Sequence, residues 1–222
     1  MTGKIAGVIG GMGPQATADF LRRIIAATPA NDDQDHIHVL VDNNPKIPSR
    51  IAAIIDGAGE DPLPVLIAMA QGLEKQGADF LAIPCNTAHY YRPSIADSVS
   101  IPVLDMVALA VAAVPGTRIG MLASPAVRKV GLYEAGLRAA GKEAVFPHDD
   151  APVLEIIRAV KAGRVTDAHR KDYERIAGAL DCDAYLIACT ELSVLGAPDG
   201  VTAPIVDALD VLVKATVAEA KE

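Results

Sequence analysis

The sequence DFLAIPC at residues 79–85 has a close counterpart in DAYLIAC at residues 183–189. Each is a short apolar run that ends in a cysteine, which is the pattern of a buried strand that runs into a loop. Small hydrogen-bonding residues follow, Asn-Thr after Cys85 and Thr-Glu after Cys189. This repetition predicts two related α/β units, each with a cysteine at one edge of its sheet.

Two further pairs of segments support an internal repeat. The opening run KIAGVI at residues 4–9 resembles TRIGMLAS at 117–124. Near the end of each half, IPVLD at 101–105 resembles APIVD at 203–207. Because the order of these segments is the same in both halves, we expect two similar lobes related by an approximate two-fold axis.

Strands and helices alternate in the first half of the chain. Apolar runs at residues 36–41, 78–84 and 101–104 read as buried strands. Helical segments are predicted at residues 16–27, 50–57 and 62–76. In the first of these helices the apolar residues share one stripe: Phe20, Leu21, Ile24 and Ile25. Strands separated by helices pair in parallel through crossover connections.

The predicted fold is therefore α/β, with two pseudo-symmetric lobes and an active site in the cleft between them. Each lobe is expected to hold a parallel, flavodoxin-like sheet flanked by helices. We expect the first lobe to comprise residues 1–101 together with a returning helix in residues 208–222. Residues 102–207 would form the second lobe.

Composition and charge argue against several classes of function. A formal net charge of −8 and an aromatic content of 4% leave little surface for phosphate contacts or base stacking, so nucleic acid is not expected as a partner. The longest apolar stretch, residues 106–114, falls well short of the roughly 20 residues of a membrane span. The opening MTGKIAGVIGG lacks the features of a secretion signal, so we expect a cytoplasmic protein.

The chain has three cysteines, which cannot all pair internally and would stay thiols in a reducing compartment. Cys182 lies at the start of its strand and is assigned to packing. Cys85 and Cys189 occupy equivalent strand ends, where the following helix favours the thiolate. Two thiols on opposite faces of one carbon could remove a proton from one side and return one to the other.

Other interpretations of these cysteines remain open at this point. A single cysteine at a strand end is often a small buried hydrophobic residue. A redox pair would need close approach through the fold, since the chain has no CxxC motif. Zinc is conceivable, because Cys85 and His89 are four residues apart and Cys189 could join them, although a second closely spaced pair of ligands is lacking.

The glycine-rich segment GMGPQA at residues 11–16 matches the pattern of dinucleotide-binding loops. Pro14 removes an amide where a phosphate would be held, and Asp42 follows Gly11 by 31 residues, where about 20 is usual. A close approach of the backbone to a small ligand is a better explanation of the glycines.

Taken together, these motifs resemble those of the aspartate/glutamate racemase superfamily, and most closely those of the aspartate racemases. The resemblance extends along nearly the whole chain. The matching blocks occur in the same order: GGMGPQAT at 10–17, NNPKIPSR at 43–50, PCNTAH at 84–89, VKAG at 160–163 and CTE at 189–191.

The resemblance implies a cofactor-independent enzyme without a metal, usually a homodimer, in which Cys85 and Cys189 are the catalytic acid and base. It places Arg50 and Lys161 at the distal carboxylate of the substrate. The residues implied near the α-carboxylate and the ammonium are Met12, Asn86, Thr87, Ser124 and Thr190.

One residue departs from the glutamate racemases, which typically have Thr-His after the second cysteine. Glu191 stands at that position here. Its carboxylate could hold the substrate ammonium or orient its neighbours, or it could be an acid favoured by the dipole at the start of a helix.

The implied activity is the interconversion of L- and D-aspartate by two-base proton transfer at the α-carbon. By analogy with the superfamily, Cys85 would deprotonate the D-isomer and Cys189 the L-isomer. The alternatives are a broad-specificity or glutamate racemase, another superfamily activity such as a decarboxylase or a cis–trans isomerase, a non-catalytic carboxylate-binding protein, and a dinucleotide-dependent oxidoreductase.

Overall fold

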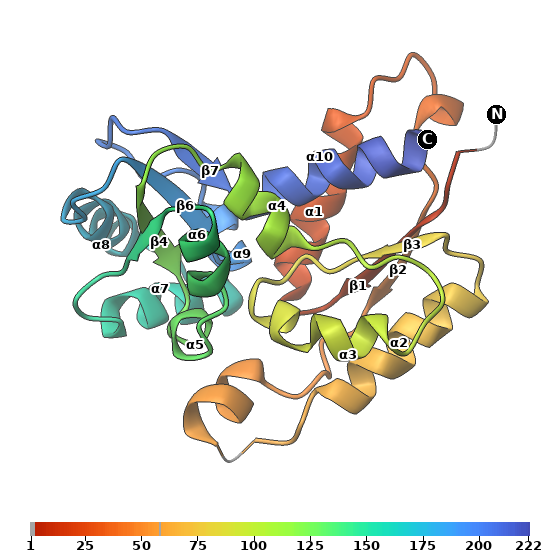
Figure 1. Cartoon of the computed structure of the whole chain (residues 1–222), viewed down its shortest axis with the longest axis horizontal. Helices are drawn as coiled ribbons and strands as arrows, with labels where there is room; N and C mark the ends of the chain where they lie inside the picture. The colour runs from red at the N-terminus through yellow and green to blue at the C-terminus, as the bar shows by residue number, and fades with distance from the viewer. Residues whose placement is uncertain (1–2, 58) are drawn as a thin grey trace.

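The computed structural model describes residues 3–57 and 59–222, which fold into two lobes, each built on a parallel β-sheet (Figure 1). The first sheet has the strand order β2-β1-β3 and the second the order β5-β4-β6-β7. The first-lobe strands are β1 (Ala6–Gly10), β2 (Val39–Asn43) and β3 (Phe80–Ala82). The second-lobe strands are β4 (Arg118–Ala123), β5 (Glu143–Val145), β6 (Ala184–Ala188) and β7 (Ile205–Asp207). The predicted α/β fold is confirmed.

The strand predicted at residues 101–104 is reduced to a single bridge between Val103 and Leu81. Around this bridge, Leu81 N donates to the Pro102 carbonyl at 2.8 Å, and Leu104 N donates to the Leu81 carbonyl at 2.9 Å. The segment thus takes the place beside β3 that β7 takes beside β6, and both sheets share one strand order. Since it belongs to the first sheet, we propose that the boundary between the lobes falls after it rather than at residue 101.

Helices cover both sheets and connect their strands. In the first half they are α1 (Pro14–Ala27), α2 (Leu63–Lys75), α3 (Arg92–Ala96) and α4 (Met106–Ala113), with short turns η1 (Asp33–Asp35), η2 (Ala52–Asp56) and η3 (Thr87–Tyr91). In the second half they are α5 (Pro125–Lys129), α6 (Glu134–Ala139), α7 (Ala151–Lys161), α8 (Asp167–Gly178), α9 (Thr190–Leu195) and α10 (Ala208–Lys221). No helix in the described ranges is long and apolar enough to cross a membrane.

Two predicted helices differ in detail from the structure. Helix α1 begins at Pro14, whose fixed φ suits the first helical position, and it buries Phe20 and Ile24. Ile25, predicted on the same stripe, is 60% exposed. The segment predicted as a helix at residues 50–57 has two α-helical residues, Arg50 and Ile51, and then the π-helix η2, which ends at Gly57 with a φ of 64°.

Helix α10 returns from the end of the second sheet and packs against α1 and α4, so that the end of the chain lies near the segment that leads into β1 (Figure 1). At its end, Lys4 N donates to the Ala220 carbonyl at 3.0 Å. The largest buried cluster contains residues of both lobes, for example Phe20, Met121 and Leu212. This shared core holds the two sheets in one orientation.

Candidate active site

The two cysteines lie just beyond the carboxyl ends of β3 and β6 and line one cavity. Cys85 is 6% exposed and Cys189 is 4% exposed. The cavity lining also contains further residues from both lobes: Met12, Arg50, Ile51, Thr87, Ser124, Ile157, Lys161 and Glu191. The structure thus brings the two predicted catalytic thiols to a common space from opposite lobes.

This cavity is small, about 20 Å³, and a second cavity of about 250 Å³ adjoins it. Arg50, Lys161 and Glu191 line both. The space at the cysteines holds about one water molecule. A substrate therefore needs part of the larger cavity, or a wider separation of the lobes, to reach both thiols.

Cys189 donates a hydrogen bond to a buried carboxylate. The distance from its Sγ to Glu191 Oε2 is 3.3 Å. Lys161 Nζ lies 3.4 Å from the other oxygen, Oε1, as an ion pair without the alignment of a hydrogen bond. Burial raises the pKa of Cys189 well above its ordinary value, and the charge and hydrogen bond of Glu191 raise it further. This environment favours a protonated Cys189.

Cys85 has a different environment, in which cations partly oppose the effect of burial. Burial raises its pKa, while the Arg50 charge and the backbone N–H of Ala88 lower it. Glu191 raises the pKa of Cys85 as well, but without a hydrogen bond to it. Of the two thiols, Cys85 is therefore the better placed to become the thiolate.

Arg50 lines both cavities and has an unused hydrogen-bond donor. Its Nη1 is held by the carbonyl of Pro48 at 2.7 Å and that of Ile47 at 3.3 Å. Its Nε is buried and has no hydrogen-bond partner among the described residues. A buried donor of this kind gains a full hydrogen bond when a carboxylate arrives.

Asn86 and Thr190, which immediately follow the two cysteines, are both buried, at 2% and 1% exposure. Asn86 Nδ2 and Thr190 Oγ1 have no hydrogen-bond partner in the described part of the chain. The Asn86 Oδ1 accepts a hydrogen bond from Tyr133 OH at 2.5 Å, which leaves the amide N–H₂ as the free end. Neither residue is in the cavity lining, but each carries an unsatisfied polar group beside a cysteine.

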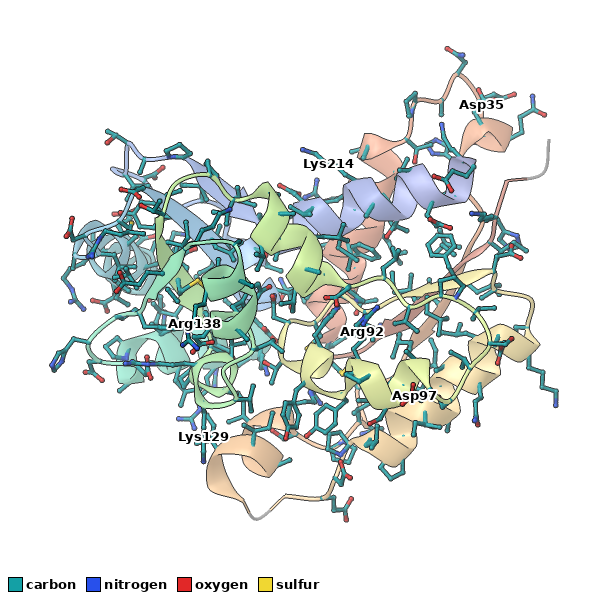
Figure 2. The ribbon with its side chains drawn as sticks, in the orientation of Figure 1. Asp35, Arg92, Asp97, Lys129, Arg138 and Lys214 are labelled. Carbon is teal, nitrogen blue, oxygen red and sulfur yellow. The ribbon has the colours of Figure 1, made fainter. Side chains whose placement is uncertain are left out.

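Thr87 and Ser124 meet across the lobes, with 3.3 Å between their hydroxyl oxygens. Ser124 is also the N-cap of α5, and its Oγ accepts from Val127 N at 3.4 Å. On the same side of the site, Lys129 of α5 donates to the Ile55 carbonyl at 2.7 Å, and Figure 2 labels this lysine. The Lys129 contact joins the segment that carries Arg50 to the second lobe, and the Thr87–Ser124 contact joins the loop after Cys85 to it.

Contacts within the protein constrain two neighbouring glycines, Gly10 and Gly11. Gly11 has a φ of 93°, and a Cβ there would lie 2.2 Å from the Asn44 carbonyl oxygen. A Cβ at Gly10 would lie 2.5 Å from Thr17 Cγ2. Contacts within the protein therefore require glycine at these two positions, whereas a Cβ at Gly13 would meet only Glu191 Oε1, at 3.7 Å. Gly11 and Gly13 nevertheless line the larger cavity.

His89 is an internal hydrogen-bonding residue and is not aimed at the cysteine thiols. It is 5% exposed; its Nδ1 lies 2.9 Å from the Cys85 carbonyl, and its Nε2 accepts from Met106 N at 3.2 Å. Both ring nitrogens are thus occupied. No group of three or more His, Cys, Asp or Glu side chains suited to a metal occurs within the described residues.

Cys182 lies away from the cavity and packs beside the second sheet. It borders the cluster that contains Tyr185, and a Cβ on Gly120 would lie 2.7 Å from its sulfur. Tyr133, by contrast, reaches Asn86 and was not predicted. Its contact crosses between the lobes, so no local sequence pattern could have indicated it.

Comparisons with known proteins define the class to which this fold and this pair of cysteines belong. The family model described as Asp/Glu/Hydantoin racemase matches residues 9–216. The chain belongs to this family, and it is accordingly a racemase, an isomerase of the amino-acid racemase type.

Individual relatives point to two kinds of substrate range. The chain is similar to the solved structure of the Picrophilus torridus aspartate racemase, with a TM-score of 0.88 and 30% identity over 98% of this chain and 94% of that one. It is 27% identical to the broad specificity amino-acid racemase RacX of Bacillus subtilis (strain 168), over 95% of this chain and 96% of RacX. A putative Asp/Glu racemase from Yersinia pestis shares the fold, with a TM-score of 0.79 at 22% identity, over 99% of this chain and 100% of that one.

Proposed function

We propose that this protein interconverts L- and D-aspartate without a cofactor, by proton transfer between the α-carbon and two cysteines. The observation that carries the proposal is the placement of Cys85 and Cys189, buried and contributed by opposite lobes, on one cavity. A thiolate on one face of the α-carbon takes its proton, and a thiol on the other face supplies one. The configuration inverts, and the two sulfurs exchange protonation states.

The unequal environments of the two cysteines support one acting as the thiolate base and the other as the thiol acid. In the resting enzyme the proposed thiolate is Cys85, near Arg50, and the proposed thiol is Cys189, which donates to Glu191. After turnover the negative charge lies on Cys189, beside the Glu191 carboxylate. Lys161, 3.4 Å from that carboxylate, partly offsets the repulsion between the two anions.

Stabilisation of the carbanion depends on donors that the protein leaves unused. An amino-acid α-hydrogen is a very weak acid, and the negative charge that forms on its removal is delocalised onto the α-carboxylate. Asn86 Nδ2 and Thr190 Oγ1, both buried and unpartnered, are suited to donate to that carboxylate. Fixed donors in a water-poor cavity stabilise such a charge more strongly than water does.

The distal carboxylate of aspartate is assigned to Arg50 and Lys161, which line both cavities. Arg50 can donate two parallel hydrogen bonds, and Lys161 supplies a point charge. In a chain with a formal charge of −8, this local positive charge is what attracts the distal carboxylate of the substrate. Glu191 competes for Lys161, so the affinity for a dicarboxylate rests mainly on Arg50.

A broad-specificity racemase is the second candidate, and the larger cavity favours it. Its volume is about 250 Å³, and beside Arg50 its lining includes four apolar residues: Ala16, Ile47, Val160 and Val194. Such a wall could accept side chains longer or less polar than that of aspartate. RacX, 27% identical to this chain, is a broad specificity amino-acid racemase.

The test is a chiral assay of the purified protein with each common amino acid in D₂O, without added pyridoxal phosphate. The proposal expects L-aspartate to yield D-aspartate that carries deuterium at the α-carbon. Turnover of several neutral amino acids at comparable kcat/KM would replace aspartate racemase by the second candidate. The homodimer stays a prediction, and analytical ultracentrifugation of the same sample tests it.

A further inference from the structure

The residue four positions after each cysteine makes contact with the carbonyl of that cysteine. His89 Nδ1 lies 2.9 Å from the Cys85 carbonyl oxygen. Ser193 Oγ lies 3.4 Å from the Cys189 carbonyl oxygen. Both side chains also reach the amino end of the next long helix, so each could connect a cysteine loop to a fixed element.

The hydrogen bonds of His89 determine its tautomer. Its Nε2 accepts from Met106 N at 3.2 Å, so this nitrogen carries no proton. The ring proton is therefore on Nδ1, which donates to the Cys85 carbonyl. Burial lowers the pKa of His89, consistent with a neutral ring. One neutral imidazole thus joins the Cys85 loop to the first residue of α4.

The amino end of α4 is itself held in place. Its N-cap, Asp105, accepts from Ala108 N at 2.9 Å and lies 3.3 Å from Arg92 Nη1. Arg92, labelled in Figure 2, also donates to the Val103 carbonyl, at 2.7 Å from Nη2. His89 therefore connects Cys85 to a helix that the first sheet and an ion pair both fix.

Ser193 has an equivalent position in the second lobe. Its Oγ donates to Asp207 Oδ1 at 2.7 Å, and Asp207 is the N-cap of α10 through a bond from Leu209 N at 2.8 Å. Arg23 Nη1 donates to the other oxygen of Asp207 at 2.7 Å, and Arg23 Nη2 donates to the Ser193 carbonyl at 2.6 Å. The single hydroxyl proton of Ser193 serves Asp207, so the Cys189 carbonyl is held by the backbone N–H of Ser193, at 3.0 Å, rather than by its hydroxyl.

We propose that His89 and Ser193 are equivalent positioning residues, which connect the Cys85 and Cys189 loops to the N-caps of α4 and α10 and so hold each sulfur on its face of the substrate. The proposal rests on the proposed two-cysteine reaction but adds two residues that touch neither substrate nor sulfur. It also predicts an asymmetry, because His89 makes the stronger contact with its cysteine.

The physical reason is that proton transfer requires both sulfurs at hydrogen-bonding distance from one carbon. A displacement of about 1 Å in a reacting group can lower turnover by roughly a hundredfold. Each cysteine follows its strand within a few residues and has only a short helix after it, η3 or α9. A side chain that ties the cysteine backbone to a long, capped helix limits this displacement.

The test uses three substitutions at His89. His89→Asn places an amide N–H₂ where Nδ1 was and keeps the bond to the Cys85 carbonyl. His89→Gln places its amide near the Nε2 position and keeps the bond with Met106 N instead. His89→Leu removes both bonds, and Thr216→Val is the matched control, because Thr216 makes a buried bond of the same i−4 type to the Leu212 carbonyl at 2.8 Å, within α10.

Two readouts are measured on each full-length variant: kcat and KM for racemisation, and the separate alkylation rates of Cys85 and Cys189 by iodoacetamide, followed by mass spectrometry. His89→Leu and His89→Gln are expected to lower kcat by about tenfold to a hundredfold with little change in KM, whereas His89→Asn stays near the wild type. The alkylation rate of Cys85 changes in the first two variants, and that of Cys189 does not. Ser193→Ala shows the converse selectivity with a smaller effect.

Three results would overturn the proposal: wild-type kcat in both His89→Leu and His89→Gln, equal changes at both cysteines, or the same changes in Thr216→Val. If His89→Leu does not fold, the contrast between His89→Asn and His89→Gln decides, and equal behaviour of these two refutes the role. A wild-type protein without racemase activity would refute the proposed function instead. The alkylation rates would still show whether His89 positions Cys85.

Discussion

Replacement of Arg50 tests how the enzyme recognises its substrate, because the structure shows which guanidinium atoms are free. Nη1 is held by two carbonyls in residues 47–48, while Nε is buried without a partner in the described ranges. We expect the edge that contains Nε to bind the distal carboxylate. Arg50→Met keeps much of the side-chain volume and removes the donors, and Arg50→Lys keeps the charge and loses the paired geometry.

The expected magnitude follows from the number of hydrogen bonds. A hydrogen bond to a charged group contributes about 1.5–3 kcal/mol. Two such bonds are lost in Arg50→Met, and water that enters the larger cavity offsets part of the loss. A net change near 3 kcal/mol corresponds to a decrease of about a hundredfold in kcat/KM for aspartate. Arg50→Lys, which keeps one bond, should lose about tenfold.

The assay compares aspartate with asparagine, which is nearly the same size but has no distal charge. Initial rates of racemisation of both are followed by chiral chromatography in the wild type and in the two Arg50 variants. We expect the preference for aspartate over asparagine to fall in Arg50→Met and asparagine turnover to change little. An equal decrease for both substrates, or an unchanged preference, would show that Arg50 does not bind this carboxylate.

Five further substitutions, at the cysteines, Glu191 and Tyr133, test the site. Cys85→Ala and Cys189→Ala should each lower racemisation by about 10²–10⁴-fold with little change in thermal unfolding, whereas Cys182→Ala should stay active; an active Cys85→Ala or Cys189→Ala enzyme refutes the two-base mechanism. Because Glu191 adds to the effect of burial in raising the pKa of Cys189, Glu191→Gln should lower that pKa. The decline of kcat/KM at high pH should then move to lower pH, and a decline at the wild-type pH would contradict this role. Tyr133→Phe leaves a buried amide oxygen without its donor and should lower the free energy of unfolding by about 1–3 kcal/mol in urea titrations, and unchanged stability would show that this hydrogen bond contributes nothing.

The sheets could be predicted from the sequence because buried parallel strands are short apolar runs, and these runs repeat in the two halves. Their exact extent could not. The segment at residues 101–104 is as apolar as β7 but forms a single bridge through Val103, since pairing depends on the position of β3. Ile25 matched the helical stripe yet is 60% exposed, and the periodicity alone does not show where the covering surface ends.

The site was predictable where the chemistry is carried by residues in a local motif. The positions of Cys85, Cys189, Arg50 and Lys161 around the cavities agree with the prediction, although their roles remain proposals. Contacts across the lobes were not predictable. The hydrogen bond between Tyr133 and the residue after Cys85 depends on the orientation of the two sheets, which no periodic pattern encodes.

The same limit applies to the glycine loop. Its sequence suggested a ligand, but the contact that excludes a side chain at Gly11 is the backbone of Asn44, 33 residues further along the chain. A pattern of glycines shows that something lies close to the backbone. Only the fold shows whether that neighbour is a ligand or the protein itself.

The central claim is that two different sulfurs act on opposite faces of one carbon, and the fate of solvent deuterium tests it most directly. L-Aspartate is incubated with the enzyme in D₂O and sampled at low conversion, and deuterium at the α-carbon is measured separately in the D-product and in the recovered L-substrate. We predict deuterium in the product and almost none in the recovered substrate, because the base that removes a proton is not the acid that returns one. Deuterium that enters both enantiomers at the same rate would indicate a single base and would contradict the account.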